Sequence, residues 1–259
     1  MRRAYNAASI IDYPSGDHPM KTIIAAGAAA FALAAAAVPA VAAGNLSGGS
    51  TLVDPDMQAQ LERWLGAGEL KLTNVYTLRP GDDSSDFHAG ADGQGPTFTL
   101  LDVTNAAGAS YLVGGYNPQS WASDEGWHET ERDWQRTAFL FNFTDPAVYR
   151  QVLSTYVLPS QGQRQTFNDI GFGPVFGSGP DLFVNDRMDA ALSWQLSYGS
   201  PADEGLSIID RSVRGQLVSV DAMEVFAISP VPEPTHAALL LAGLGVAGLF
   251  ARKREGEAG

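Results

Sequence analysis

The chain offers few side chains that could act as nucleophiles, bases or metal ligands. It contains no cysteine, which excludes thiolate nucleophiles and cysteine metal sites, and it has four histidines. Between residues 44 and 230 only His88 and His128 remain, and neither lies near a Gly-x-Ser-x-Gly nucleophile turn. A Ser-His-Asp triad would require one of these two histidines. We therefore predict no catalytic residue, and we interpret His88 as packed on a short helix.

Acidic side chains are abundant, with 29 Asp and Glu against 16 Lys and Arg and a formal net charge of −13. This excess excludes nucleic acid as a partner, because few cations are present to displace counterions from phosphates. Two facing carboxylates could hydrolyse a glycan, and their pairing cannot be read from the sequence, so a carboxylate-based glycan hydrolase remains an alternative. The acidic segment 82–86 is typical of a solvated helix start. It lacks EF-hand spacing, so we predict no cofactor or metal, with weak Ca²⁺ binding left open.

Two short helices are predicted from their start signals. Residues 55–64 form an amphipathic helix, since Asp54 is a good N-cap and Pro55 suits the first helical position. Residues 84–91 form a second helix, capped by Ser84 or Ser85.

Strands are predicted where alternating or β-branched runs lie between Gly and Pro residues. They cover 70–78, 97–103, 110–116, 138–143, 174–176, 181–184 and 217–228. Segment 129–133 is interpreted as a solvated loop. The pattern predicts a mostly β (α+β) fold, an antiparallel two-sheet β-sandwich with a few short helices, flanked by an N-terminal signal peptide and a C-terminal sorting helix.

The N-terminal region has the features of an export signal. Residues 1–19 show no periodicity, and we interpret Met20 as the start. Lys21 is followed by an apolar run at 23–37 and by small residues suited to cleavage after Ala42 or Ala43. Residues 20–43 are therefore predicted to be a secretory signal peptide that signal peptidase removes.

The C-terminal region has three parts in order: a short motif, an apolar run at 237–250, and a basic cluster. The motif is Val231, Pro232, Glu233 and Pro234, and the basic cluster is Arg252, Lys253 and Arg254. The apolar run spans roughly 21 Å as a helix, less than the ~30 Å of a bilayer core, so we expect a transient inner-membrane association. Segment 231–254 resembles the PEP-CTERM sorting signal of Gram-negative bacteria. That resemblance implies recognition by an exosortase and delivery to the cell surface or exopolysaccharide matrix, with 255–259 as a tail.

The region 44–230 has the length of one domain. An ordered series of residues within 58–228 resembles the TLDc domain, which occurs with TBC and LysM domains. The residues that carry it are Asp92, Gly93, Gly95, Pro96, Gly114, Gly115, Tyr116, Trp121, Gly173, Pro174, Phe176, Gly177, Gly179, Asp181, Glu224 and Phe226. The resemblance implies an interaction module, linked in eukaryotes to oxidative-stress resistance and the vacuolar ATPase. Ala91 stands where family members often have Cys, and Pro180 where they often have His.

Two glycine patterns within this region indicate a scaffold. The pair Gly114 and Gly115 lies in an apolar run and predicts a bulge or a close backbone approach. Segment 171–179 is predicted to be an ordered loop in which Phe172 and Phe176 pack inward, because a phosphate-binding loop would need a Gly-Lys-Ser/Thr sequence.

The leading hypothesis is an exported, non-enzymatic interaction domain with a stress-protective role, whose partner is a protein or an exopolysaccharide. The alternatives are a matrix glycan-binding module that uses Trp121 or Trp127, and the hydrolase. A cleft with two facing, unpaired carboxylates would favour the hydrolase. A flat exposed Trp would favour glycan binding. A closed sandwich with neither would favour the interaction module.

Overall fold

The computed structural model describes residues 45–155 and 161–231. The predicted cleavage positions Ala42 and Ala43, and the sorting segment from Pro232 onward, lie outside these described residues.

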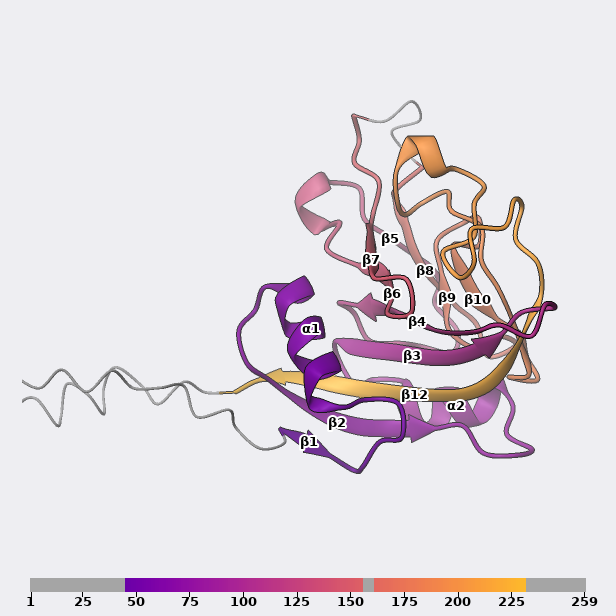
Figure 1. The fold of residues 1–259 in the computed structure, drawn as a ribbon. Helices are drawn as coiled ribbons and strands as arrows, with labels where there is room; N and C mark the ends of the chain where they lie inside the picture. Colours follow the sequence, from indigo (N-terminus) through magenta and orange to yellow (C-terminus); the bar gives the residue numbers. More distant parts are fainter. Residues whose placement is uncertain (1–44, 156–160, 232–259) are drawn as a thin grey trace, which may run out of the picture. The chain divides into compact units, whose positions relative to one another are not determined.

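Seven strands form the first sheet, in which all neighbours are antiparallel except the first pair. In spatial order they are β1 (Leu46–Ser47), β2 (Leu70–Thr77), β12 (Val218–Pro230), β3 (Thr97–Thr104), β4 (Ser110–Asn117), β6 (Phe139–Asn142) and β7 (Ala147–Arg150). Figure 1 shows the orange-yellow β12 running between the purple β2 and β3, although about 115 residues of chain separate β12 from β3.

Five shorter strands form the second sheet. They are β5 (Gly126–Glu129), β8 (Arg164–Asn168), β9 (Val175–Phe176), β10 (Leu182–Val184) and β11 (Ala190–Leu192). Strand β12 joins the two sheets into one continuous twelve-stranded sheet: its first residues pair with β11, and its later residues pair with β2. A register shift between Val220 and Ala222 lies between these two stretches, where a bulge bends a strand.

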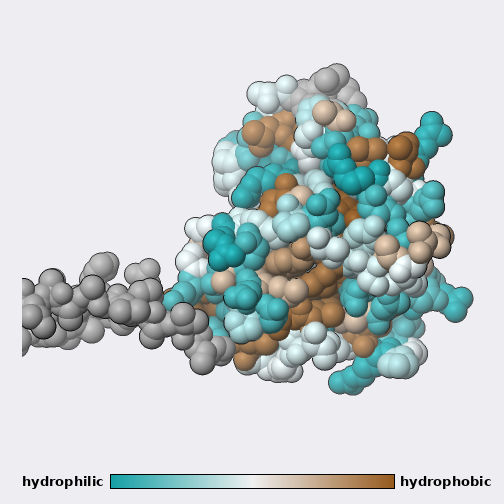
Figure 2. Space-filling model, in the orientation of Figure 1, coloured by the Kyte–Doolittle hydropathy of each residue, from teal (hydrophilic) through white to brown (hydrophobic). Residues whose placement is uncertain are grey.

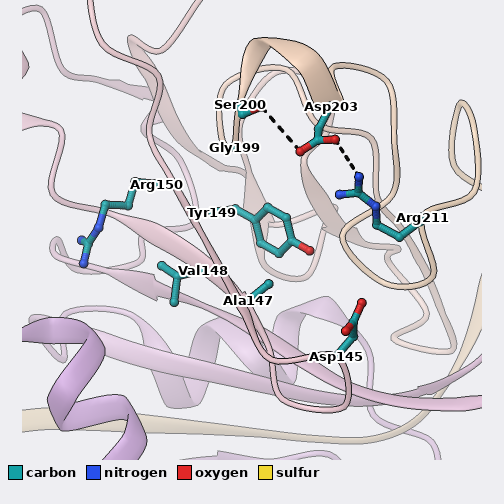
Figure 3. A pocket seen from close by; sticks show the side chains of 9 residues that line it. All are labelled: Asp145, Ala147, Val148, Tyr149, Arg150, Gly199, Ser200, Asp203 and Arg211. Carbon is teal, nitrogen blue, oxygen red and sulfur yellow. Dashed lines mark hydrogen bonds and ion pairs between the residues drawn. The ribbon is translucent and has the colours of Figure 1, made fainter.

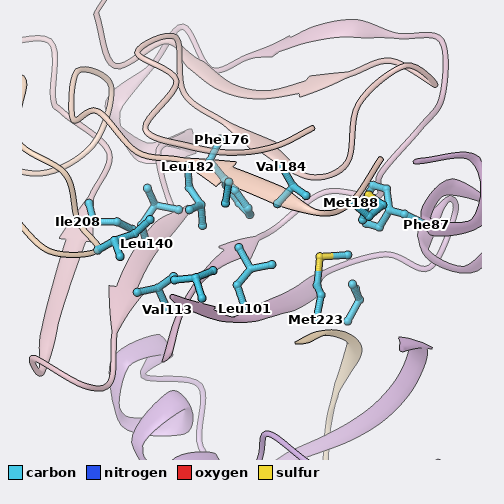
Figure 4. Packing of buried hydrophobic residues seen from close by; sticks show 14 of the residues in the cluster. Phe87, Leu101, Val113, Leu140, Phe176, Leu182, Val184, Met188, Ile208 and Met223 are labelled. Carbon is cyan, nitrogen blue, oxygen red and sulfur yellow. The ribbon is translucent and has the colours of Figure 1, made fainter. Parts of the chain in front are cut away.

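The main hydrophobic core lies between the two sheets. In Figure 4, Leu101 and Val113 of the first sheet face Leu182 and Val184 of the second, with Phe176 beside them. All five side chains are buried. The structure therefore confirms the predicted mostly β, sandwich-like fold.

Helix α1 (Pro55–Leu65) covers the outer face of the first sheet, where it closes a second core. The Asp54 carboxylate accepts from the backbone N–H of Met57 at 2.8 Å, which confirms the predicted cap. Gly66 ends the helix with a φ of 73°, in the left-handed region that favours glycine. Trp64 lies 5.6 Å from the Phe141 ring and anchors α1 on the sheet.

Helix α2 (Ser84–Ala91) has the predicted bounds but a different cap. Asp83 is the N-cap, and its carboxylate accepts from the N–H of Ser85 at 2.8 Å. Asp86 accepts from the N–H of Asp83 in return, completing a capping box. The prediction of Ser84 or Ser85 as the cap was wrong, because the carboxylate of Asp83 takes that position.

The predicted strands all occur, with no end shifted by more than two residues; the largest shift is at β12, which runs on to Pro230. Strands β1, β5, β7, β8 and β11 were not predicted. Strand β5 includes Glu129, which had been assigned to a loop; pairing with β8 makes this residue part of the sheet. Within 45–155 and 161–231, no helix is long and apolar enough to cross a membrane, and the apolar run 237–250 lies outside those ranges.

Candidate functional site

Trp121 is the centre of the residues that carry the TLDc resemblance. Asp92 forms a β-bridge with it, and the N–H of Gly93 donates to its carbonyl at 3.1 Å. The indole Nε1 donates to Thr97 Oγ1 at 3.0 Å, and the residue is 1% exposed. Trp121 is therefore a core residue, and the alternative in which it stacks on a sugar is wrong for this residue, because its ring is buried.

Gly114 and Gly115 pair regularly with β3, and neighbouring atoms pack closely against both of them. A Cβ on Gly115 would lie 2.6 Å from Cζ of Phe176, and one on Gly114 would overlap the Thr99 carbonyl. The close approach is confirmed, and the register with β3 shows no bulge here. Phe176 is buried as predicted, but Phe172 is 37% exposed, so its predicted inward packing was wrong.

Asp181 is fully buried and serves as an acceptor for backbone amides. Its Oδ1 accepts from Leu196 N at 2.6 Å and from Tyr198 N at 2.8 Å, and its Oδ2 from Ser197 N at 3.0 Å. Burial raises the pKa of Asp181 to about 7, against the opposing effect of these donors. The carboxyl group fixes the 196–198 segment beside β10.

Glu224 has the same kind of role on β12. It is 1% exposed and accepts from Thr51 N at 2.8 Å, from Leu52 N at 3.4 Å and from the Ser50 hydroxyl. These bonds attach segment 50–53 to the outer side of the first sheet. Both acids of the predicted family motif thus stabilise the scaffold.

His88 is buried in the same way. Its Nδ1 lies 2.7 Å from Asp92 Oδ1, and its Nε2 lies 3.0 Å from the Asp169 carbonyl oxygen. These contacts connect α2 to the loop that precedes β9. The interpretation of His88 as a packed helix residue is confirmed.

A cleft of 520 Å³ opens at the outer edge of β7 (Figure 3). One wall is β7 itself, and the other is the segment from Gly199 to Arg211. Its lining residues are Asp145, Ala147, Val148, Tyr149, Arg150, Gly199, Ser200, Asp203 and Arg211. None of them was singled out from the sequence, because the walls lie about 50 residues apart in the chain and no local motif marks either one.

Two of the four charged residues that line this cleft, Asp203 and Arg211, form an ion pair. Arg211 donates to Asp203 Oδ1 at 2.6 Å, and this hydrogen bond raises the arginine pKa. Burial raises the pKa of Tyr149, and the neighbouring Arg211 lowers it in part. Because Asp203 is held by Arg211, the cleft does not present two unpaired carboxylates together with Asp145. This arrangement is suited to hydrogen bonding more than to proton transfer.

A second, polar cleft of 370 Å³ lies beside β2 and the start of α2. Asp82 accepts there from the Tyr76 hydroxyl at 3.2 Å and from the Arg79 N–H at 3.0 Å. Burial and the Asp82 carboxylate raise the pKa of Tyr76. Asp86 also lines this cleft and belongs to the capping box of α2. Both acids of the cleft, Asp82 and Asp86, therefore have structural roles. Among the residues the structure describes, no three His, Asp or Glu side chains are grouped to hold a metal.

A third cleft, of 210 Å³, is aromatic and lies on the second sheet. Trp127 of β5 pairs with Phe167 of β8, and their rings are 4.9 Å apart. The Arg164 guanidinium lies 4.8 Å from the Trp127 ring centroid, and Phe172 closes one side. The second tryptophan considered for glycan binding is thus partly exposed in an apolar setting. Hydrophobic residues also gather in the middle of the face drawn in Figure 2, with hydrophilic residues around them.

Comparison with known proteins identifies one part of the chain. Residues 230–254 match the PEP-CTERM protein-sorting motif, and that match does not include 58–228. No curated protein matches the chain. The sorting motif marks the chain as an exported surface protein of a Gram-negative bacterium that exosortase processes during export.

Proposed function

We propose that residues 44–230 form a TLDc-like, non-enzymatic interaction module that the sorting segment delivers to the cell surface or exopolysaccharide matrix. Residues 20–43 act as the signal peptide and 237–250 as a transient inner-membrane anchor in this proposal. The observation that carries it is the role of the motif residues: Asp181, Glu224 and Trp121 are all buried and bonded to the scaffold.

The clefts support a binding role. A retaining or inverting glycan hydrolase needs two carboxylates about 5–10 Å apart, one free to protonate and one to attack or activate water. Asp203 is paired with Arg211, and Asp82 with Tyr76 and the Arg79 amide. Carboxylates used in this way are poor candidates for both roles.

The proposal is tested on the full chain, expressed with its own signals and recovered from the cell-surface fraction. Surface proteins that co-purify are identified by mass spectrometry, purified and titrated back against the chain. Saturable binding of one purified protein is the expected result. Release of reducing sugar from matrix polysaccharide would refute the non-enzymatic role.

Glycan binding is a second candidate, because Trp127 lies in the aromatic cleft with Phe167 and Phe172. Aromatic rings flanked by a cation are common sugar platforms. On a polysaccharide array, this candidate predicts binding by the wild-type chain that Trp127→Ala abolishes. Trp134→Ala is the matched control, since Trp134 is 71% exposed but lies outside that cleft.

A further inference from the structure

We propose that the β7 cleft binds an extended polypeptide from a partner protein, which adds to the first sheet as a strand beside β7. This inference rests on the proposed function as an interaction module and names the partner's chemistry. Strand β7 is the last in the order of its sheet and pairs along its length only with β6 among the described strands.

The orientation of the backbone groups on β7 follows from the bonds at its end. The Arg150 carbonyl accepts from the N–H of Gly199 at 2.8 Å, so this carbonyl points away from β6. Gln151 N donates to the Ala138 carbonyl at 3.4 Å, in the opposite direction. Because these directions alternate along a strand, the N–H and C=O of Val148 also point away from β6, into the cleft.

The chain's own pairing strand ends before it reaches Val148. Tyr198 bridges Gln151, and Gly199 then takes a φ of 93°, in the left-handed region. Ser200 caps a short 3-10 helix, η2 (Pro201–Asp203), which turns the chain away from β7. Pro201 also lacks the N–H that a continuing strand would donate. Among the described residues, the outward N–H and C=O of Val148 and the N–H of Arg150 have no hydrogen-bond partner.

These free groups have the spacing of a polypeptide. Val148 and Arg150 are two residues apart, so their outward groups repeat at about 6.8 Å, the repeat of an antiparallel strand. A sugar has no backbone of that period, whereas a peptide of four residues matches the length of Ala147–Arg150. The cleft volume of 520 Å³ is within the range of about 300–1,000 Å³ seen for ligand sites.

The cleft walls predict the pattern of the bound peptide. Figure 3 shows Tyr149 pointing toward Arg211, while Arg150 and Val148 point to the other side. Val148 packs with the core under α1, which is apolar. Side chains of an added strand alternate in the same way, so one set contacts apolar atoms and the next contacts Tyr149 and Arg211. We therefore expect bound peptides with alternating apolar and polar residues.

In the test, random heptapeptides displayed on phage are selected for binding to the full chain. The enriched peptide is then synthesised. A series with one N-methyl group at each successive backbone nitrogen is titrated against the chain. Strand addition predicts alternation: about tenfold weaker binding at every second position and little change between, since each loss removes about one hydrogen bond. In NMR exchange, the Val148 amide should become protected when peptide is added, and the Tyr149 amide should stay unchanged.

The variant Val148→Pro removes the outward N–H, at an edge position where proline is tolerated. It should weaken the peptide about tenfold. Val148→Ala keeps the N–H and is the matched control, with less than about threefold change. If Val148→Pro fails to fold, the N-methyl series on the wild-type chain still decides.

Three outcomes would overturn the inference: no peptide enriched on the chain, N-methyl effects without alternation, or full binding by Val148→Pro. Concentration-dependent dimers that protect Val148 would also overturn it, because a second copy would then be the occupant. If wild type and Val148→Pro capture the same surface protein equally, the β7 inference fails while the proposed function stands. If neither captures a protein, the proposed function fails, and the peptide series still tests the cleft.

Discussion

Asp181 makes the stability of this domain depend on pH in an unusual direction. Burial raises the pKa of Asp181 from 3.8 to about 7, so between these values the folded chain holds a proton that the unfolded chain has released. Stability falls with rising pH wherever the folded state binds more protons. The contribution of Asp181 to the free energy of unfolding should therefore be highest below about pH 4, fall as pH rises toward 7, and level off above it.

The size of the effect follows from the shift. Each pKa unit corresponds to 1.36 kcal/mol, so a shift of about three units costs about 4 kcal/mol at neutral pH. Acids with lowered pKa values, Asp83, Asp133 and Asp210, act in the opposite direction, but only where pH falls below their ordinary range near 3.8. These three acids therefore do not contribute between pH 5 and 7, where the raised pKa of Asp181 acts.

The assay is urea unfolding of the full chain, followed by tryptophan fluorescence at half-unit steps from pH 4.5 to 8. The same titration is made on Asp181→Asn. The amide keeps one oxygen for Leu196 and Tyr198 but turns a donor toward the Ser197 N–H, a loss of roughly 1–3 kcal/mol at low pH. Subtracting the two curves removes the contribution of every other ionisable group, because the two proteins share all of them.

The stability of wild type minus that of Asp181→Asn should fall by up to about 4 kcal/mol as pH rises, so Asp181→Asn should become the more stable protein at the top of the pH range. Asp133→Asn is the control, because Asp133 is exposed at its Ser154 contact and its lowered pKa predicts a flat difference above pH 5. A difference that stays flat, or grows with pH, for Asp181→Asn would refute the reasoning. It would mean that the backbone donors outweigh burial and keep the carboxylate ionised.

Three further changes test the scaffold by urea unfolding and thermal melts. Gly115→Ala should cost about 1–3 kcal/mol, because its Cβ would lie 2.6 Å from the buried Phe176 ring; unchanged stability would mean that the core is looser than it looks. Glu224→Gln should lower the free energy of unfolding by roughly 1–3 kcal/mol, because it leaves the Thr51 or Leu52 amide without an acceptor. Unchanged stability would contradict the role of Glu224 in holding segment 50–53 on the sheet. Asp54→Ala should cost about 1 kcal/mol and lower Tm by about 2–4 °C, whereas Asp54→Asn, which keeps a capping oxygen, should change it little.

Local signals were sufficient for the elements that carry their own start, stop and period. Asp54 and Pro55 define the beginning of α1, and the predicted helix 55–64 differs from the observed one by a single residue. The alternation at 70–78 gave β2 in the same way. Such elements are set by caps and by side-chain periodicity, which act within a few residues.

Long-range pairing decided the elements that were missed. The sequence of β8, Arg-Gln-Thr-Phe-Asn, has one strongly β-forming apolar residue, and β5 is as short as four residues. Each becomes a strand because the other lies beside it, from Gly126–Asn168 to Glu129–Arg164. Strand preference depends more on such neighbouring strands than on the backbone itself. A polar run is therefore assigned to a loop when its pairing strand is not known.

The same distinction separates the two tryptophans that the sequence left equivalent. Trp121 and Trp127 lie six residues apart, yet one is sealed in the core by Phe87 and Phe176 and the other remains partly exposed beside Arg164. Only the packing of α2 and β9 against the first sheet creates that difference, and neither contact is local.

The residues that carry the TLDc resemblance have structural roles, and none of them lines the β7 cleft. Glu224 accepts hydrogen bonds from backbone amides, Gly115 leaves space for the ring of Phe176, and Trp121 fills the core. Such residues are constrained by the fold itself, whatever the domain binds. The β7 cleft is built instead from Tyr149 and Arg211, which belong to no part of that series. A partner is therefore better sought through the exposed edge of β7 than through the roles that the TLDc resemblance implies.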